Sequence, residues 1–497
     1  MATLSGSFKP SATSAAREGG PRDRTSFAIV TSLFFVWGFI TCMNDLLIPK
    51  FKAAFELTQF QANLVQFAFF GAYFCVSLLY FILSATKGDP INRIGYKNGL
   101  VLGLGVAGLG CLLFYPAAQL HLYWLFLGAL LILGSGVTLI QIAANPYISI
   151  LGPQESAPSR LNLSQGLCSL GYVIAPLVGG LLLFGTSVYQ SAGGVDAVKM
   201  PYLGLAVAFF ALAATFKLIR LPGFENTEKV TAGVKAFRHK HFFWGWLAIF
   251  FYVGSEVTVG SILINYLGEV MGLSHRDADK YLSFYWGGLM IGRLMGAIAM
   301  GNIRASMRIP WMAVSAIVST LIIFASATFK QKLTSDVFIN PMDVLPYIAL
   351  IALCLVFFMS GGSRPGRTVG IFAAVAAALT VCSMSAGGAV ALWSLIGIGL
   401  FNSIMWSNIF TLSIRDLGDD TPQGSSLLVM MIVGGALMPL IQGALMDRVG
   451  VRLSLSIVLV GYAYLMFFGF FAWKFGRATA DGDGALQRKM ITTDYTD

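Results

Sequence analysis

The sequence has little charge for its length. Charged residues make up 11% of its 497 residues, whereas a soluble domain carries about 25%. Hydrophobic residues make up 56%, and they gather in blocks of roughly 17 to 28 residues, the length that spans a bilayer. This composition excludes an ordinary soluble domain and predicts an all-α polytopic membrane protein.

Patterns for metal sites, disulfides and hydrolytic chemistry are also missing. The six cysteines lie in apolar blocks without a Cys-x-x-Cys pair, so buried free thiols are expected. The four histidines fall in loops or near block ends, so we expect no metal site and no cofactor. No Gly-x-Gly-Asp, His-Glu-x-x-His or Gly-x-Ser-x-Gly string stands within a block, which argues against an intramembrane enzyme.

The basic residues indicate the topology. With the N-terminus inside, 23 lysines and arginines fall in cytoplasmic segments and 9 in external ones, which predicts that both termini are cytoplasmic. The net charge of +10 then comes from basic residues in the short loops between the apolar blocks, so no nucleic-acid partner is expected. Residues 1–24 are polar and basic, and we expect no cleavable signal peptide. Fourteen spans are predicted, at 26–48, 60–86, 98–116, 121–149, 160–185, 201–219, 241–268, 279–301, 309–328, 344–361, 368–386, 389–414, 422–446 and 451–474.

Residues recurring at two fixed offsets predict an internal repeat. Gly38 matches Gly254 at an offset of 216. A second set of residues matches at an offset of 263, which is 47 residues larger. The extra 47 residues fit two short helices, so we predict two six-helix halves with a helical pair inserted in the second half. Chance matching among glycines and prolines is the alternative. At the second offset, Asn145, Gly171, Pro176 and Gly180 match Asn408, Gly434, Pro439 and Gly443.

This repeat sets the predicted domains. They are a cytoplasmic tail at 1–25, an N-terminal six-helix bundle at 26–221, a cytoplasmic linker at 222–240, a C-terminal bundle at 241–474 with the inserted pair at about 307–362, and a second tail at 475–497.

Six dispersed regions carry a resemblance to one family. In their order they resemble the fucose–galactose–glucose:proton symporter family of the major facilitator superfamily over most of residues 26–474, outside the inserted pair. The resemblance implies the major facilitator fold and proton-coupled sugar uptake by alternating access. The strings are Phe34-Phe-Val-Trp-Gly-Phe with Met43-Asn-Asp-Leu-Leu-Ile-Pro49, Gln141-Ile-Ala-Ala-Asn-Pro-Tyr147, Arg160-Leu-Asn-Leu-Ser-Gln-Gly166, Tyr252-Val-Gly-Ser-Glu-Val257, Tyr285-Trp-Gly-Gly-Leu-Met-Ile-Gly-Arg293 and Gly399-Leu-Phe-Asn-Ser-Ile-Met405.

Departures from the family pattern bear on the substrate. Gln141 is an amide where the fucose permease branch has an acid needed for transport, and Glu256 is an acid where that branch has an amide. The chain is therefore nearer the glucose/galactose branch. Trp406, Ser407 and Asn408 replace a usual Phe-Pro-Thr centre in a helix that faces the cavity of this fold, which leaves the choice of sugar open.

Asp45 is the first candidate for proton coupling. It stands beside Asn44 inside a membrane-length apolar run, where a charged carboxylate costs several kcal/mol unless it is neutralised or solvated. An acid under that penalty serves as a reversible proton carrier, and a carboxyl bonded to a helix end is the alternative.

Glu256 and Arg293 are further charged residues within predicted spans. Glu256 is a candidate second proton site, a sugar ligand or a partner for Arg293. Arg293 keeps its charge when buried and needs a carboxylate or carbonyls, so a structural ion pair is expected there.

Sugar recognition is expected from amides and an indole ring. Amides both donate and accept hydrogen bonds, as sugar hydroxyls do, and aromatic faces stack on a sugar ring. Interhelical hydrogen bonding is the alternative for each amide. The candidate substrate ligands are Asn44, Gln66, Gln141, Asn145, Asn162, Gln165, Glu256, Asn265, Trp286, Asn402 and Asn408.

Two motifs concern gating and direction. Asn92-Arg93-Ile-Gly95-Tyr-Lys97 resembles the superfamily's helix 2–3 loop signature, with Asn92 where an Asp is usual, and it predicts weak stabilisation of the outward-facing state. Gly171-Tyr-Val-Ile-Ala-Pro176-Leu-Val-Gly179-Gly180 resembles the antiporter signature, with Ala175 replacing a Gly. Small-residue packing alone explains this string, and it is the preferred interpretation.

The sequence therefore predicts proton-coupled uptake of a glucose- or galactose-like hexose across a bacterial inner membrane. The expected partners are the sugar, the proton and the lipid bilayer, and a monomer is expected. The alternatives are symport of N-acetylglucosamine, fucose or another sugar, sodium-coupled sugar symport, and an efflux antiporter for drugs or sugars.

Overall fold

The computed structural model describes residues 21–57, 59–184, 194–219, 221–222, 232–273, 275–334 and 344–475. All regular structure in these segments is α-helix or 3-10 helix. The predicted tails lie outside the described residues apart from 21–25 and 475, and the predicted linker is described only at 222 and 232–240.

The described N-terminal half is a bundle of long helices joined by short elements. Helix α4 packs against both α5 and α8, and α1 packs against α6. The long helices are α1 (Pro21–Ala54), α2 (Gln59–Lys87), α4 (Tyr96–Leu120), α5 (Tyr123–Ile150), α6 (Ala157–Phe184) and α8 (Lys199–Leu218), and the short elements are α3 (Pro90–Ile94), η2 (Gln154–Ser156) and η3 (Gly194–Val198).

The described C-terminal half contains more elements, several of them broken helices. Its elements are η4 (Ala236–Arg238), α9 (Lys240–Met271), α10 (His275–Ala299), α11 (Ala305–Thr334), α12 (Leu345–Gly361), α13 (Pro365–Ser385), α14 (Gly388–Asn402), α15 (Met405–Ser413), η6 (Gly418–Asp420), α16 (Thr421–Met430), η7 (Met431–Val433), α17 (Gly434–Ser454), α18 (Ser456–Phe470) and η8 (Ala472–Lys474).

Two predicted spans differ in shape from the helices found. The span predicted at 389–414 is interrupted between α14 and α15, at 403–404. The span predicted at 422–446 is divided between α16 and α17 by η7. The break predicted between residues 446 and 451 coincides with a kink inside α17, where Gly450 has non-helical φ 81° and ψ 167°, a conformation that favours glycine.

Both halves contain a close helix crossing built on glycine. A methyl group on Gly171 of α6 would stand 2.4 Å from the carbonyl oxygen of Phe35 on α1. A methyl group on Gly434 at the start of α17 would stand 2.2 Å from the carbonyl oxygen of Phe250 on α9. These two glycines are a pair matched by the repeat offset of 263, and the absence of a side chain lets each helix pair approach backbone to backbone.

The helices α11 and α12 occupy the region of the predicted inserted pair. Helix α11 packs against α10 and α6, and α12 packs against α13 and α14. Helix α13 packs against α14 and α18, the same arrangement that α4 has with α5 and α8. Ten helices in the described residues are long and apolar enough to cross a membrane, so fourteen crossings stay a prediction.

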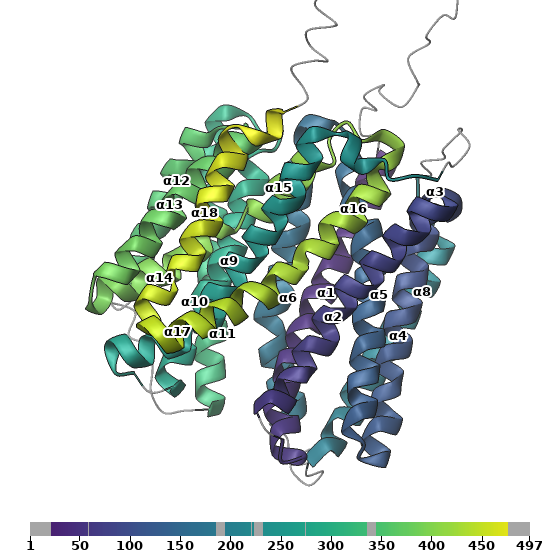
Figure 1. Ribbon diagram of the computed structural model, residues 1–497, viewed down its shortest axis with the longest axis horizontal. Coiled ribbons are helices and arrows are strands. Elements are labelled where there is room, and N and C mark those ends of the chain that lie inside the picture. The colour runs from purple at the N-terminus through teal and green to yellow at the C-terminus, as the bar shows by residue number, and fades with distance from the viewer. Residues whose placement is uncertain are drawn as a thin grey trace, which may run out of the picture.

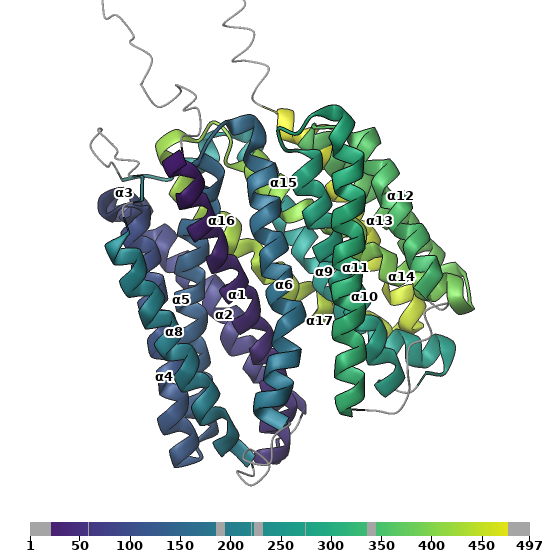
Figure 2. The same cartoon turned by 180° about the vertical axis from the view of Figure 1, so that it is seen from behind.

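The start of α1 and the end of α18 lie at the same end of the molecule, the upper end in Figures 1 and 2. We call this the terminal end. The outer surfaces of the helices expose large apolar side chains such as Trp124, Val207, Leu321 and Leu440. Such surfaces suit acyl chains rather than water, as a membrane protein requires.

Candidate functional site

Glu256 and Arg293 lie together in the C-terminal half. Arg293 Nη2 on α10 is 3.9 Å from Glu256 Oε2 on α9. The side chains of Arg293 and Glu256 are 9% and 12% exposed, so both charges are largely removed from solvent. The hydroxyl of Tyr252, one turn before Glu256, donates to the same carboxylate oxygen. The structure thus brings together the two ionisable residues for which the sequence suggested an ion pair.

Arg293 also bridges the two halves of the molecule. Its Nη1 donates to Ser169 Oγ on α6 of the N-terminal half, at 2.6 Å. Its Nε donates to the carbonyl of Ser403 at 3.2 Å, which the break after α14 leaves outside helical pairing. One guanidinium therefore contacts an acid, a hydroxyl and a carbonyl from three separate elements. A guanidinium has five donors in a rigid fork, which suits this three-way contact.

A buried chain of hydrogen bonds connects the backbone of Glu256 with Tyr462. Tyr285 OH donates to the Glu256 backbone carbonyl at 2.7 Å. Asn402 Nδ2 donates to Tyr285 OH at 3.4 Å, and Tyr462 OH donates to Asn402 Oδ1 at 2.9 Å. Both hydrogen-bonding atoms of Asn402 thus have protein partners, so this predicted sugar ligand stabilises the C-terminal half.

Gln141 and Asn44 bond to tyrosines inside the N-terminal half. Gln141 Nε2 on α5 donates to Tyr73 OH on α2 at 2.9 Å. Asn44 Oδ1 on α1 accepts from Tyr202 OH on α8 at 3.3 Å. Asn44 is 4% exposed and Gln141 is 1% exposed. Both residues therefore bond within one half, but Asn44 Nδ2 and Gln141 Oε1 have no protein partner among the described residues.

Asn162 and Asn408 meet across the two halves. Asn162 Nδ2 on α6 donates to Asn408 Oδ1 on α15 at 3.2 Å. Both residues are fully buried. This hydrogen bond uses one polar atom of each asparagine, so that atom is not available to a ligand.

Several buried amides keep hydrogen-bonding atoms without a protein partner among the described residues. Such atoms are costly unless a ligand or water satisfies them. They come from α1, α5 and α6 of one half and α15 of the other, on residues that the sequence selected. They are Asn44 Nδ2, Gln141 Oε1, both side-chain atoms of Asn145, Asn162 Oδ1, Gln165 Nε2 and Asn408 Nδ2.

Trp286 stands where the two halves face each other. Its ring on α10 lies parallel to that of Tyr172 on α6, with 6.3 Å between centroids and 11° between planes. Gly260 on α9 lies beneath it, since a methyl group there would stand 2.8 Å from the indole. The half-buried indole thus has one aromatic partner from the opposite half.

Three predicted residues are not brought into these contacts. The backbones of Asp45 and Gln66 lie in α1 and α2, but their side chains lie outside the described residues. Asn265 is exposed on α9, beyond Glu256 toward the end opposite the terminal end.

The two halves are joined at the terminal end by Gln423. The side chain of Gln423, at the start of α16, is 3% exposed. Its Nε2 donates to Ser84 Oγ on α2 at 3.0 Å and to the Gly233 carbonyl at 2.9 Å. Its Oε1 accepts from the backbone N–H groups of Lys235 and Ala236 at 2.9 and 3.1 Å. One glutamine therefore ties together α2, the linker and α16.

Helix α3 adds contacts at the same end. Asn92 Nδ2 donates to the Asp419 carbonyl of the C-terminal half at 2.8 Å, whereas Arg93 donates to the carbonyl of Lys87 at the end of α2. Asp89 caps α3 by accepting from the N–H groups of Ile91 and Asn92. Burial raises the pKa of Asp89, against the opposing effect of these hydrogen bonds and those from neighbouring hydroxyls.

The described residues contain no group of three His, Cys, Asp or Glu side chains suited to a metal ion. Cys42, Cys111, Cys168 and Cys354 are buried. The expectation that all six cysteines are buried is wrong for Cys75 and Cys382, which are exposed.

Sequence reasoning missed Ser169 and Tyr462, which partner the selected residues Arg293 and Asn402, and it missed Gln423, which joins α2, the linker and α16. Serine and glutamine near helix ends are common, and nothing in their spacing indicates a partner more than a hundred residues away. A comparison of the buried polar positions on facing helices would have been needed to find them.

Known proteins resemble this chain over most of its length. The family model described as Major Facilitator Superfamily matches residues 25–363. The glucose/galactose transporter of Brucella abortus is 40% identical over 451 residues, which cover 90% of this chain and 93% of that protein. The L-fucose-proton symporter of Escherichia coli is 31% identical over 451 residues, with 85% and 87% covered.

A solved structure gives the same result for the fold. A crystal structure of FucP, a Major Facilitator Superfamily transporter in the outward conformation, has a TM-score of 0.68 to this chain at 29% identity. The match covers 90% of this chain and 98% of the FucP chain. The resemblance drawn from the sequence strings is confirmed: the chain belongs to the major facilitator superfamily, within the family of the glucose/galactose transporters and fucose–proton symporters.

Proposed function

We propose that this protein is a membrane sugar transporter that takes up a glucose- or galactose-like hexose together with a proton. The names of its relatives support sugar as the cargo, and their bacterial sources support the inner membrane. The observation that carries the proposal is the buried contact of Arg293 with Glu256 on one side and with Ser169 of the other half on the opposite side. This contact links a titratable group to the docking of the two halves.

Two acids share the proton in this proposal. Asp45, in the first helix, is the primary carrier, because its place in an apolar run makes its charge costly. Glu256 is the second site. When Glu256 takes a proton, Arg293 loses its counter-charge and keeps the acceptors Ser169 and Ser403. Protonation therefore changes the balance of contacts that hold α10 against α6.

The sugar is held by amides of the N-terminal half. Gln141, Asn145 and Gln165 supply hydrogen-bonding atoms that lack protein partners in the described part of the chain. Sugar hydroxyls donate and accept, so they can satisfy both kinds of amide atom. The face of Trp286 offers an apolar surface for the C–H side of the sugar ring. Discrimination among hexoses then follows from which hydroxyls reach these amides, since an unpaired buried polar group is strongly penalised.

The conformation described here is outward-facing in this proposal. Gln423, Asn92 and Asp419 close the terminal end, which the Lys and Arg distribution assigns to the cytoplasm. The likeness to FucP in the outward conformation supports the same assignment. Inward opening requires these contacts to break while the halves rotate about their shared surface.

We also propose that α11 and α12 are an inserted pair. Setting them aside leaves α9, α10, α13, α14–α15, α16–α17 and α18 as a six-helix half. Its packing then repeats that of the N-terminal half, with α13 in the position of α4.

The deciding experiment is uptake by proteoliposomes of the Asp45→Asn variant. Each proton entering with a membrane potential contributes about 2.3 kcal/mol per 100 mV, roughly a fifty-fold sugar gradient. Asp45→Asn should abolish this accumulation while sugar exchange across the membrane continues. The matched control, Glu269→Gln, changes an exposed acid at the far end of α9 and should behave as the unmodified protein. Full accumulation by Asp45→Asn would refute proton coupling through this residue.

Substrate and ion are assigned in the same liposomes. A panel of glucose, galactose, mannose, fructose, N-acetylglucosamine and fucose identifies the preferred sugar. Replacing the proton gradient by a sodium gradient separates the two coupling ions. Expulsion of sugar under an outside-acid gradient would favour an efflux antiporter instead.

A further inference from the structure

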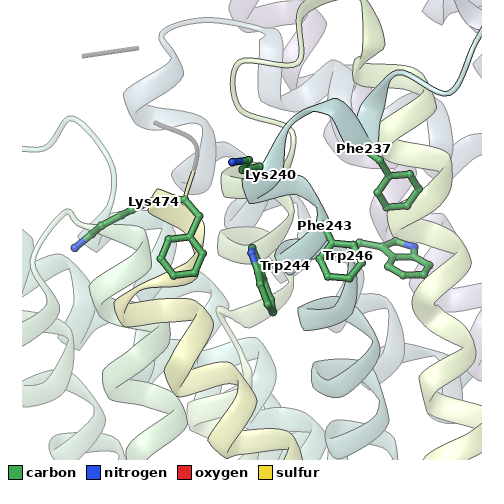
Figure 3. Close-up of a pocket in the computed structure, with 7 residues that line it drawn as sticks. Phe237, Lys240, Phe243, Trp244, Trp246 and Lys474 are labelled. Carbon is green, nitrogen blue, oxygen red and sulfur yellow. The ribbon is translucent and has the colours of Figure 1, made fainter. Parts of the chain in front are cut away.

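A groove of about 930 Å³ opens at the terminal end of the C-terminal half, where η4 and α9 begin and η8 ends the described chain. Figure 3 shows its lining side chains, with the Lys474 side chain extending away from the aromatic rings. The α9 residues of the groove precede Glu256 on that helix, and Phe237 directly follows Ala236, whose N–H donates to Gln423. Its lining residues are Phe237, Lys240, Phe243, Trp244, Trp246, Lys474 and Phe475.

Two aromatic clusters form the walls of the groove. On one side the rings of Phe237 and Trp246 meet edge to face, with 5.4 Å between centroids. On the other side Trp244 contacts Phe475 at 6.0 Å and also packs on Phe467 at 5.4 Å. The walls are therefore fixed by ring contacts within the protein, and the groove between them presents apolar surface.

The charge of the groove has one sign. Two of its seven lining residues are lysines and none is acidic. Among the described residues no ion pair joins Lys240 or Lys474 to a carboxylate, although Lys474 Nζ lies 5.7 Å from the ring centre of Trp473. Both lysines are exposed, so their charges are available to an anion.

We propose that this groove binds an anionic phospholipid of the surrounding membrane. Tryptophan and lysine together are typical of the headgroup level of a membrane protein. The phosphodiester headgroup of such a lipid carries a negative charge that can pair with the two lysines. The acyl chains of the lipid suit the apolar aromatic walls. The predicted cytoplasmic side is also where lysines near the surface gain from anionic lipid. A soluble anion would satisfy the lysines but would leave five aromatic side chains against water.

The proposal concerns binding alone and does not depend on which sugar is carried. The test uses the full-length protein purified in detergent and titrated with phosphatidylglycerol or with phosphatidylcholine of the same acyl chains. Native mass spectrometry counts the bound lipids and gives their apparent dissociation constants. We expect phosphatidylglycerol to bind more tightly than phosphatidylcholine.

Variants separate the headgroup contact from the apolar contact. Lys240→Gln with Lys474→Gln should weaken phosphatidylglycerol binding by about ten- to thirty-fold, since each such lysine contributes about a factor of five. The matched control is Arg304→Gln with Arg308→Gln, which removes two charges from the α10–α11 connection and the first turn of α11 at the same end and should leave this binding unchanged. Phe243→Ser, at an exposed ring, should weaken the binding of both lipids equally.

Three results would overturn the proposal. One is equal weakening by the lysine pair and the arginine pair, which would mean general attraction to a basic surface. Another is equal affinity for the two lipids in the unmodified protein. The third is lipid binding that appears only after residues 476–497 are removed, because the occupant would then be the end of this chain.

Discussion

The contact between Glu256 and Arg293 predicts a strong and specific energetic coupling. Glu256→Gln keeps the shape of the side chain and removes its charge. Two unit charges about 4 Å apart attract by about 4 kcal/mol at an effective dielectric constant of 20, and the atoms here are 3.9 Å apart. Removing one partner of a buried ion pair typically costs about 3–5 kcal/mol. Glu256→Gln should therefore lower the free energy of unfolding by about 3 kcal/mol or more.

A double-mutant cycle tests this contact. Glu256→Gln, Arg293→Gln and the double variant are unfolded by titration with a denaturing detergent in mixed micelles, and each free energy is compared with that of the unmodified protein. The double variant carries no buried charge at this site, so it should lose at least 2 kcal/mol less than the sum of the two single losses. Glu269→Gln, an exposed acid on the same helix, should change stability by no more than about 0.5 kcal/mol.

Additive losses would refute the reasoning. In that case Glu256 and Arg293 would contribute independently, and the proposed path from a proton on Glu256 to the surface between the halves would have no energetic basis. Uptake by the same variants adds a second readout. If the pair transmits protonation, Ser169→Ala should lower the rate of transport while leaving the Glu256–Arg293 coupling energy intact.

Two further predictions concern the gate and the helix crossings. Gln423→Ala removes four hydrogen bonds, so it should shift the equilibrium toward the inward-open state by about 2 kcal/mol or more, measured as longer spin-label distances between the halves at the terminal end. The control Gln154→Ala removes a 3.5 Å exposed contact and should leave these distances unchanged. Unchanged distances for Gln423→Ala would contradict the role of Gln423 in closing the terminal end. Gly171→Ala forces a methyl group to 2.4 Å from the Phe35 carbonyl and should cost about 3 kcal/mol, whereas Gly105→Ala meets nothing within 4 Å and should be neutral in thermal unfolding.

The helices were predictable because membrane length and hydropathy are local properties. The sequence alone located each long helix of the described residues to within a few residues of its core. The ends were less predictable. The first span was expected at 26–48, but α1 runs from Pro21 to Ala54, because a helix continues past the apolar core wherever its backbone hydrogen bonds can still form. Hydropathy measures transfer into lipid, whereas a helix end depends on capping and on turns such as Gly450.

The charged and amide members of the site were predictable because burying them is costly. Glu256, Arg293 and Asn162 stand out in apolar helices for that reason. Their partners do not stand out. Ser169 lies 124 residues from Arg293 and Asn408 lies 246 residues from Asn162, so no local pattern connects them. A serine or asparagine in a membrane helix costs little, and only the packing of the two halves shows which ones face each other.

The same packing explains why one arginine can couple two events. Arg293 contacts an acid on α9, a hydroxyl on α6 and a carbonyl at the break after α14. A guanidinium cannot give up its charge at physiological pH, so it must keep acceptors whenever Glu256 is neutral. The Ser169 and Ser403 oxygens then carry more of its interaction, and separating α6 from α10 becomes more costly. Under the proposed proton-coupled uptake, the proton would set how firmly the halves are joined beside Trp286, and the sugar would be released once loss of the proton had weakened that contact.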